Sequence, residues 1–76
     1  MTFQIQQSCV RLWHKHGQAA LELQKNEGNR DLIRLHWLAH NHYRSAELAY
    51  IAKQNTKGNL YLTWAAKVEA KIKALK

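Results

Sequence analysis

Apolar residues recur along the first third of the chain with the spacing of an α-helix. Alternate steps of four and three residues join Ile5, Cys9, Leu12, His16, Ala19 and Leu23. At about 100° per residue these positions share one face, and polar residues such as Lys15 and Glu22 lie opposite. The last third carries a comparable stripe, made of Tyr61, Trp64, Ala65, Val68, Ile72 and Leu75. Both segments are therefore predicted to be amphipathic helices.

The middle third differs because it carries two apolar faces. The first consists of Leu32, Leu35, Ala39, Tyr43, Ala46 and Tyr50. The second, rotated by more than about 100°, consists of Ile33, Trp37, Leu48 and Ile51. A helix that is apolar on most sides is usually buried on most sides. This favours a central helix that contacts both other helices. The alternative is that the second face binds another copy of the chain or another protein.

Two short segments rich in turn-forming residues, 26–29 and 55–59, divide the chain, and each ends in Gly followed by Asn. Glycine suits the left-handed conformation just past a helix, and asparagine can cap the helix that follows. Proline is absent. These features predict an all-α fold of three antiparallel helices, roughly 2–26, 30–54 and 60–75, joined by two short Gly-Asn turns within a single helical domain covering 1–76.

The same stripes predict the buried side chains. We expect Leu12, Leu35, Tyr43, Val68 and Ile72 to be largely buried. Gly17 interrupts the first helix at a cost of about 1 kcal/mol relative to alanine, which indicates a close helix crossing or a kink there. The tryptophans fall one on each helix, which favours an aromatic cluster of Trp13, Trp37 and Trp64.

Few residues are suited to catalysis or metal binding. The five carboxylates are spread along the chain without a close pair for acid–base work. Cys9 lies on an apolar stripe, where a free cysteine usually behaves as a small hydrophobe. His36 and His40 have the i, i+4 spacing of a metal-binding pair, but no glutamate follows His36, and the nearby Arg44 would repel a cation. We therefore expect no catalytic residue, no cofactor and no metal site.

The charge is strongly positive, with 12 Lys and Arg against 5 Asp and Glu and a formal net charge of +7. The five histidines, with an ordinary pKa near 6.5, can raise this charge toward about +12 in acid. The excess is concentrated at the C-terminal end, in Lys53, Lys57, Lys67, Lys71, Lys73 and Lys76. Such a surface attracts nucleic-acid phosphates or an acidic protein, although it is also the ordinary solvated face of a small domain. Because lysine reads bases less well than arginine, we place the protein partner first.

These observations predict a non-enzymatic regulator or inhibitor that acts by stoichiometric contact with a macromolecular partner. The predicted partner-binding residues are Ile33, Trp37, Arg44, Leu48 and Ile51, since aromatic residues beside arginine are typical of binding hot spots. The alternative is a nucleic-acid-binding protein that uses the C-terminal lysines. No apolar run of about 20 residues and no leader pattern are present, so we expect a cytoplasmic protein without membrane contact, either monomer or homodimer. In size, charge and lack of catalytic groups, the chain is similar in type to small accessory proteins of phages and plasmids, including anti-CRISPR inhibitors.

Overall fold

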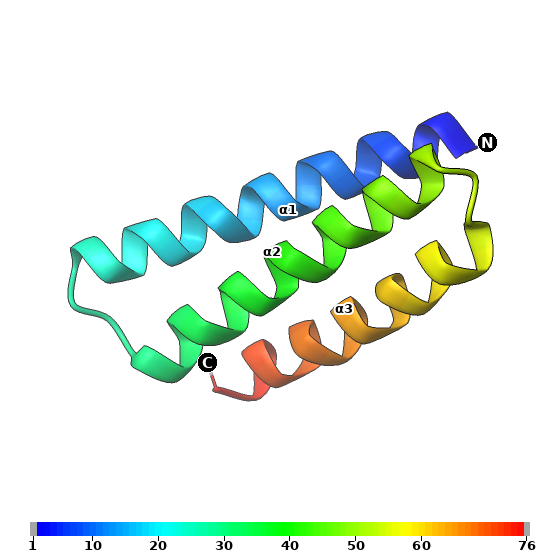
Figure 1. Ribbon diagram of the computed structural model, residues 1–76. Helices are drawn as coiled ribbons and strands as arrows, with labels where there is room; N and C mark the ends of the chain where they lie inside the picture. Colours follow the sequence, from blue (N-terminus) through cyan, green and yellow to red (C-terminus); the bar gives the residue numbers. More distant parts are fainter. Residues whose placement is uncertain (1, 76) are drawn as a thin grey trace.

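The computed structural model describes residues 2–75, with side chains from residue 4 onward. Three helices account for nearly all of this range: α1 (Thr2–Lys25), α2 (Arg30–Ile51) and α3 (Asn55–Leu75). Each helix runs antiparallel to the one before it, and the described residues include no strand (Figure 1). The predicted all-α fold of three antiparallel helices is confirmed.

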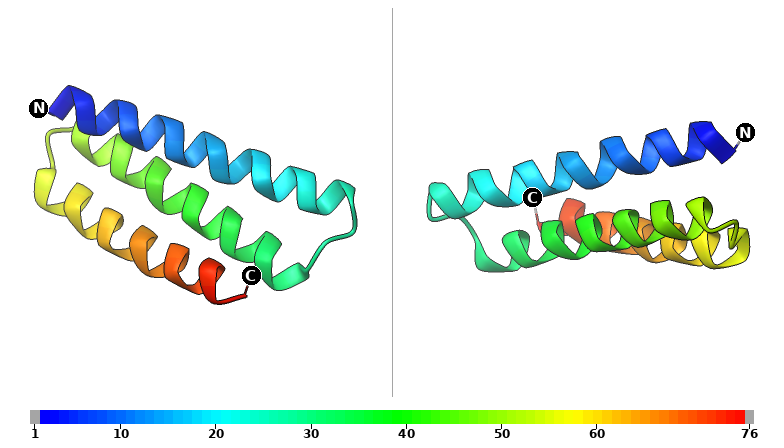
Figure 2. Two further views of the ribbon diagram at one scale, coloured as in Figure 1. Left: turned by 180° about the vertical axis from the view of Figure 1, so that it is seen from behind. Right: turned by 45° about the horizontal axis from the view of Figure 1, so that its top comes forward.

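The three helices form an open layer with α2 in the middle. Seen from either side, α1 and α3 lie on opposite flanks of α2 (Figures 1 and 2). Within residues 2–75, α2 packs against both neighbours, whereas no Cα atom of α1 lies within 8 Å of a Cα atom of α3. The prediction of a central helix that contacts both others is confirmed. Contact between α1 and α3 depends on side chains that reach across from each helix.

Small side chains allow α2 to approach both neighbours closely. Four alanines are completely buried, namely Ala20, Ala39, Ala46 and Ala65. One hydrophobic cluster joins Cys9, Ala46 and Tyr50 across the helices, and the other joins Ala39, Val68 and Ile72. Alanine is the best helix former and adds little bulk, so these positions serve both the helices and their packing.

The predicted core is correct at three of its five positions. Tyr43, Val68 and Ile72 are buried, but Leu12 and Leu35 are only partly buried. Leu12 and Leu35 stay partly accessible because the three helices form an open layer. Leu12 lines a cleft between α1 and α3 together with Leu62, and Leu35 lines a surface depression at the other end.

The first turn follows the expected position but not the expected conformation. Asn29 caps α2 as predicted, since its side chain accepts hydrogen bonds from the N–H groups of Asp31 and Leu32 at 2.7 and 3.1 Å. The left-handed residue is Glu27, with φ of 53°, and not Gly28. The N–H of Gly28 donates to the carbonyl of Leu23, which closes a Schellman motif around Glu27.

The predicted second turn is wrong by several residues. The chain turns at 52–54, α3 begins at Asn55, and Gly58 lies inside α3 with its N–H donating to the carbonyl of Gln54. Lys53 takes the left-handed conformation with φ of 61°. Gly58 is buried against Tyr50, so packing and not turn formation accounts for the absence of a side chain at this position.

Gly17 also has a packing role. A Cβ atom at this position would stand 3.0 Å from Nδ1 of His40 and 3.8 Å from the Trp37 ring. Because α1 is continuous from Thr2 to Lys25, the close approach of α2 side chains, and not a break in the helix, explains the glycine.

Candidate functional site

A buried polar network connects all three helices at their centre. It consists of His16 on α1, His36 and Tyr43 on α2, and Glu69 on α3, and we call it the histidine network. Nδ1 of His16 lies 2.9 Å from Nδ1 of His36, and Nε2 of His16 lies 3.1 Å from a carboxylate oxygen of Glu69. The Tyr43 hydroxyl donates to the other oxygen of Glu69. Both histidines are buried, and the Tyr43 ring stacks on the His16 ring at 5.9 Å.

The partners of these groups determine where the protons lie. The Glu69 carboxylate accepts hydrogen bonds, so His16 carries a proton on Nε2, and one proton lies between the two Nδ1 atoms. Burial acts to raise the pKa of Glu69, but hydrogen bonds from Tyr43 and His16 outweigh it, and the pKa falls below its usual value. Burial, followed by the bond to Glu69, raises the pKa of Tyr43 well above its usual value. Glu69 is therefore an anion held between two donors.

A second cluster joins α1 to α2 nearer the surface. The indole N–H of Trp13 donates to Glu47 at 3.0 Å, and Arg44 donates to the same oxygen at 2.8 Å. The guanidinium of Arg44 lies 5.2 Å from the centre of the Trp13 ring, which is a cation–π distance. His40 donates from Nδ1 to the carbonyl of Trp13 at 2.7 Å. These contacts hold Arg44 in a fixed orientation on the outside of α2.

The tryptophans form two groups and not the single predicted cluster. The rings of Trp13 and Trp37 each meet the His40 ring edge-on at 5.3 Å. Trp64 instead contacts His42 and Tyr61. His42 and Trp37 are five residues apart on α2 and so point about 140° apart around the helix, which separates the two groups.

The i, i+4 spacing of His36 and His40 places both rings against α1. The two rings make separate contacts with α1: Nδ1 of His36 faces His16, and Nδ1 of His40 faces the carbonyl of Trp13. Among the residues described, no group of three or more His, Cys, Asp or Glu could hold a metal ion. Cys9 is buried, and burial, followed by the charge of Glu47, raises the pKa of its thiol. That environment disfavours a reactive thiolate.

The predicted partner-binding residues differ in their surroundings. Ile33 and Trp37 are partly buried, and Trp37 packs beside Gly17 and His40 of the α1–α2 contact. Leu48 and Ile51, by contrast, are 50% and 57% exposed. The first half of the second apolar face of α2, Ile33 and Trp37, is thus partly buried, and the second half, Leu48 and Ile51, lies on the surface.

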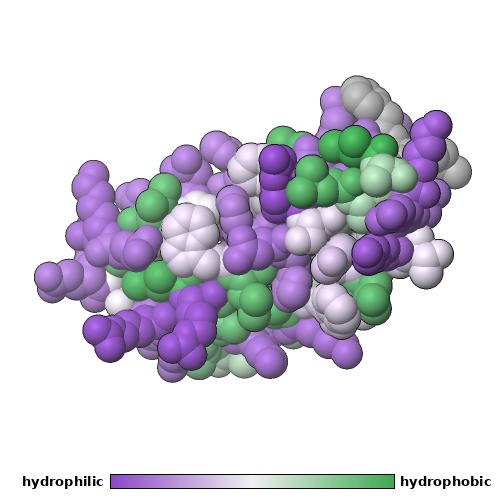
Figure 3. All heavy atoms as spheres, in the orientation of Figure 1, coloured by the Kyte–Doolittle hydropathy of each residue, from purple (hydrophilic) through white to green (hydrophobic). Residues whose placement is uncertain are grey.

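Val10 of α1 is a further exposed apolar residue, and it was not predicted. It is 39% exposed and lines a surface depression with Arg11 and Glu47. We call Val10, Leu48 and Ile51 the exposed patch. Figure 3 shows hydrophobic side chains gathered at the end of the molecule where α1 begins and α2 ends. Sequence alone could not find Val10, because it lies off the apolar stripe of its own helix.

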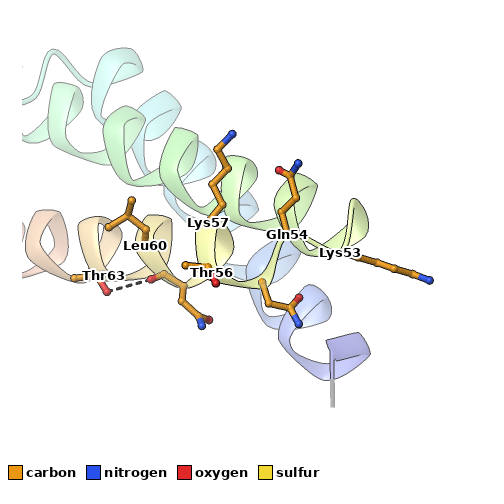
Figure 4. Close-up of a pocket in the computed structure, with 8 residues that line it drawn as sticks. Lys53, Gln54, Thr56, Lys57, Leu60 and Thr63 are labelled. Carbon is orange, nitrogen blue, oxygen red and sulfur yellow. Dashed lines mark hydrogen bonds between the residues drawn. The ribbon is translucent and has the colours of Figure 1, made fainter.

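The C-terminal lysines do not converge on one point. Lys53 and Lys57 line a depression at the turn between α2 and α3 but extend in different directions (Figure 4). Three of the lysines share one exposed face of α3 with two apolar residues, and we call this set the α3 lysine stripe: Lys57, Leu60, Trp64, Lys67 and Lys71. Lys73 is exposed but lies off this stripe, and Lys76 is outside the described residues.

Glu69 was also absent from the predicted site. Residues 65, 68, 69 and 72 have the i, i+3, i+4, i+7 spacing of a buried face. An acidic residue at such a position is the signal that could have indicated a buried polar partner on another helix.

Comparison of the chain with models of known protein families, with curated protein sequences and with solved structures gives no significant match. No described helix combines the length and the apolar character that crossing a membrane requires.

Proposed function

We propose that this chain is a non-enzymatic binding protein that makes stoichiometric contact with a protein partner through the exposed patch. The observation that carries the proposal is the burial pattern of α2. Two of its faces are covered by α1 and α3, yet Leu48 and Ile51 remain about half exposed, and Glu47, next to Leu48 in the chain, lines a depression with the exposed Val10. Covering apolar surface gains about 25 cal/mol per Å², so a partner that buries these side chains gains association free energy.

The surrounding charges favour a partner with an apolar surface and an acidic rim. Arg44 is half exposed, and its contacts with Trp13 and Glu47 orient it before binding. Arg11 is exposed and lines the same depression as Val10. Side chains that are already ordered lose less conformational entropy on association. The role is that of a regulator or inhibitor of the kind found among phage and plasmid accessory proteins, acting in the cytoplasm.

The test uses charge substitution in the exposed patch with a matched control. Tagged protein is used to capture partners with and without nuclease, and the purified partner is then titrated by calorimetry. Leu48→Asp should abolish a one-to-one complex, because it places a carboxylate in the buried contact. Leu21→Asp is the control, since Leu21 is 52% exposed and lies near the C-terminal end of α1.

Equal affinity in both variants, or equal loss in both, would contradict the proposed surface. A second copy of the chain is the other occupant to test. If a second copy of the chain occupies the exposed patch, sedimentation of the parent at increasing concentration should show a dimer. Leu48→Asp should dissociate this dimer, and Leu21→Asp should not.

A second candidate function is binding of single-stranded nucleic acid by the α3 lysine stripe. The specific observation is the inward direction of Glu69, the only acid in residues 53–76. Because Glu69 bonds to His16 and Tyr43, the charged side chains on the outer face of α3 are all positive. Trp64 is 40% exposed between Lys57, Lys67 and Lys71, and an exposed indole allows a base to stack.

This candidate is tested with a fluorescent single strand at about 50 mM salt, where phosphate contacts are strong. Binding should weaken log-linearly with added salt, and Lys67→Gln should reduce the slope by about one. Lys25→Gln, an exposed lysine at the end of α1, should leave the slope unchanged. Absence of binding at low salt would eliminate this function.

A further inference from the structure

The α3 lysine stripe is long enough to contact several nucleotides. Lys57, Lys67 and Lys71 follow one exposed face of α3, and Trp64 lies between the first two. Because each helical residue advances about 1.5 Å, Lys67 and Lys71 stand about 6 Å apart along the helix axis, and Lys57 and Lys71 stand about 21 Å apart. The shorter distance is close to the separation of neighbouring phosphates in an extended single strand. The whole stripe therefore has the length of about four nucleotides.

Trp64 is held in place with part of its ring accessible. The indole is 40% exposed. It meets the Tyr61 ring edge-on at 5.5 Å, with 78° between the ring planes, and it meets the His42 ring at 5.8 Å and 53°. Neither neighbour stacks parallel on the indole, yet together they restrict its orientation from two helices. A ring that is ordered in advance loses little conformational entropy when a base stacks on it.

Building on the second candidate function, we infer that the α3 lysine stripe is a binding site for about four nucleotides of a single strand, with one base stacked on Trp64. Lys57 and Lys67 lie on either side of Trp64 in the stripe, so their ammonium groups can contact the phosphates that flank the stacked nucleotide. In a duplex both faces of each base are covered by neighbouring base pairs, and only the phosphates are offered to the stripe. The site therefore selects single strands by stacking and tolerates any sequence, since every base has a π face.

A carboxylate lies at the end of the site formed by Lys71. Asp31 of α2 lines a surface depression together with Arg34 and Lys71. The negative charge of Asp31 opposes a phosphate on Lys71, so Asp31→Asn should tighten the binding of a four-nucleotide strand at low salt, where screening is weak. An unchanged affinity would show that the strand does not reach Lys71, and would overturn the inferred length of the site.

The main experiment measures the affinity of the parent protein for fluorescent oligothymidylates of two, four, six and eight nucleotides at about 50 mM salt. The affinity should rise steeply up to four nucleotides and only slightly beyond, and long strands should bind one chain per about four nucleotides. A four-nucleotide abasic strand should bind at least about fivefold more weakly than tetrathymidylate, because it has no base to stack. Tetrauridylate should bind as well as tetrathymidylate, because base faces and phosphates are common to RNA and DNA.

Two substitutions of Trp64 form a matched pair. Trp64→Leu removes the aromatic face and should weaken tetrathymidylate binding at least about fivefold, whereas Trp64→Phe keeps a ring and should retain most of the affinity. Circular dichroism checks that both variants have the helix content of the parent. In the parent itself, NMR should show that tetrathymidylate shifts the indole N–H signal of Trp64 and leaves those of Trp13 and Trp37 in place.

Failure of this site and failure of the second candidate function give different results. If no strand binds at about 50 mM salt, both are eliminated. Salt-sensitive binding that is equal for abasic and intact strands, or equal in Trp64→Leu and Trp64→Phe, would leave the lysines as a phosphate-binding surface and overturn the stacking site. An affinity that still rises steeply from four to eight nucleotides would overturn the inferred length. Tetrauridylate binding more than about tenfold tighter than tetrathymidylate would show recognition of the 2′-hydroxyl, contrary to a site of stacking and phosphate contacts alone.

Discussion

The Tyr50 ring packs directly against Gly58, and a Cβ atom at residue 58 would stand 2.7 Å from Cζ of the ring. Tyr50 is only 2% exposed, and its hydroxyl donates to the side chain of Asn59, the residue that follows Gly58 in α3. The ring therefore has little freedom to move aside. A residue type that usually weakens a helix is here required by the contact between two helices.

Gly58→Ala should destabilise the protein, although alanine is the better helix former by about 1 kcal/mol. Overpacking against a confined ring costs about 1–3 kcal/mol, so we expect a net loss in urea unfolding. In a Tyr50→Leu background the same change should cost less, or become stabilising, since the ring is gone. A Gly58→Ala protein that is more stable than the parent would show that the Tyr50 ring can move aside.

Lys53→Gly should stabilise the protein. Lys53 has φ of 61° at the end of α2, a conformation that costs a residue with a Cβ atom about 1 kcal/mol or more. Its N–H donates to the carbonyl of Tyr50, and that of Gln54 donates to the carbonyl of Ala49. Glycine keeps this Schellman motif and removes the strain, so the free energy of unfolding should rise by about 1 kcal/mol. Lys53→Ala retains a Cβ atom and should show no comparable gain.

The two turns show what the sequence could and could not predict. Helical periodicity identified three helices, because the spacing of apolar residues depends only on local geometry. The Gly-Asn pair at residues 28 and 29 did mark a turn, and Asn29 caps α2. The same pair at residues 58 and 59 lies within α3, where the Tyr50 ring occupies the space that a side chain at residue 58 would fill. A tertiary contact decided that position, and local propensity could not reveal it.

The candidate site was predictable to a smaller extent. The second apolar face of α2 pointed to surplus apolar surface near Trp37 and Ile33, but the residues left exposed are Leu48 and Ile51, because Trp37 packs beside Gly17 of another helix. Likewise, His36 and His40 were correctly placed on one helix, whereas their partners lie on α1. Which side chains meet between two helices depends on how each helix is rotated about its own axis. One periodic stripe of apolar residues does not determine that rotation.

Tyr43 should make stability decline in alkali. Burial, followed by the bond to Glu69, raises the pKa of Tyr43, so the native hydroxyl stays protonated where the unfolded one ionises near pH 10. The native state then holds more protons, and stability falls as the pH rises above about 10. Tyr43→Phe should weaken this decline and cost about 1–2 kcal/mol at neutral pH, because Glu69 loses a donor. Tyrosinate absorbance and urea unfolding measure the two effects; an unchanged alkaline slope in Tyr43→Phe would contradict this assignment.

Trp37 and Leu48 belong to the same stripe of α2 but should respond to substitution in opposite ways. Trp37 is partly buried, meets His40 edge-on and lies beside Gly17, so Trp37→Ala should leave a cavity between α1 and α2 and cost about 2 kcal/mol or more. Leu48 is 50% exposed, and Leu48→Asp should change the free energy of unfolding by less than about 1 kcal/mol. Thermal unfolding of both variants, compared with the parent, measures this difference. A stable Trp37→Ala protein that loses its partner would move the binding surface toward the first half of α2, because the Trp37 side chain would then contribute to the complex and not to the fold.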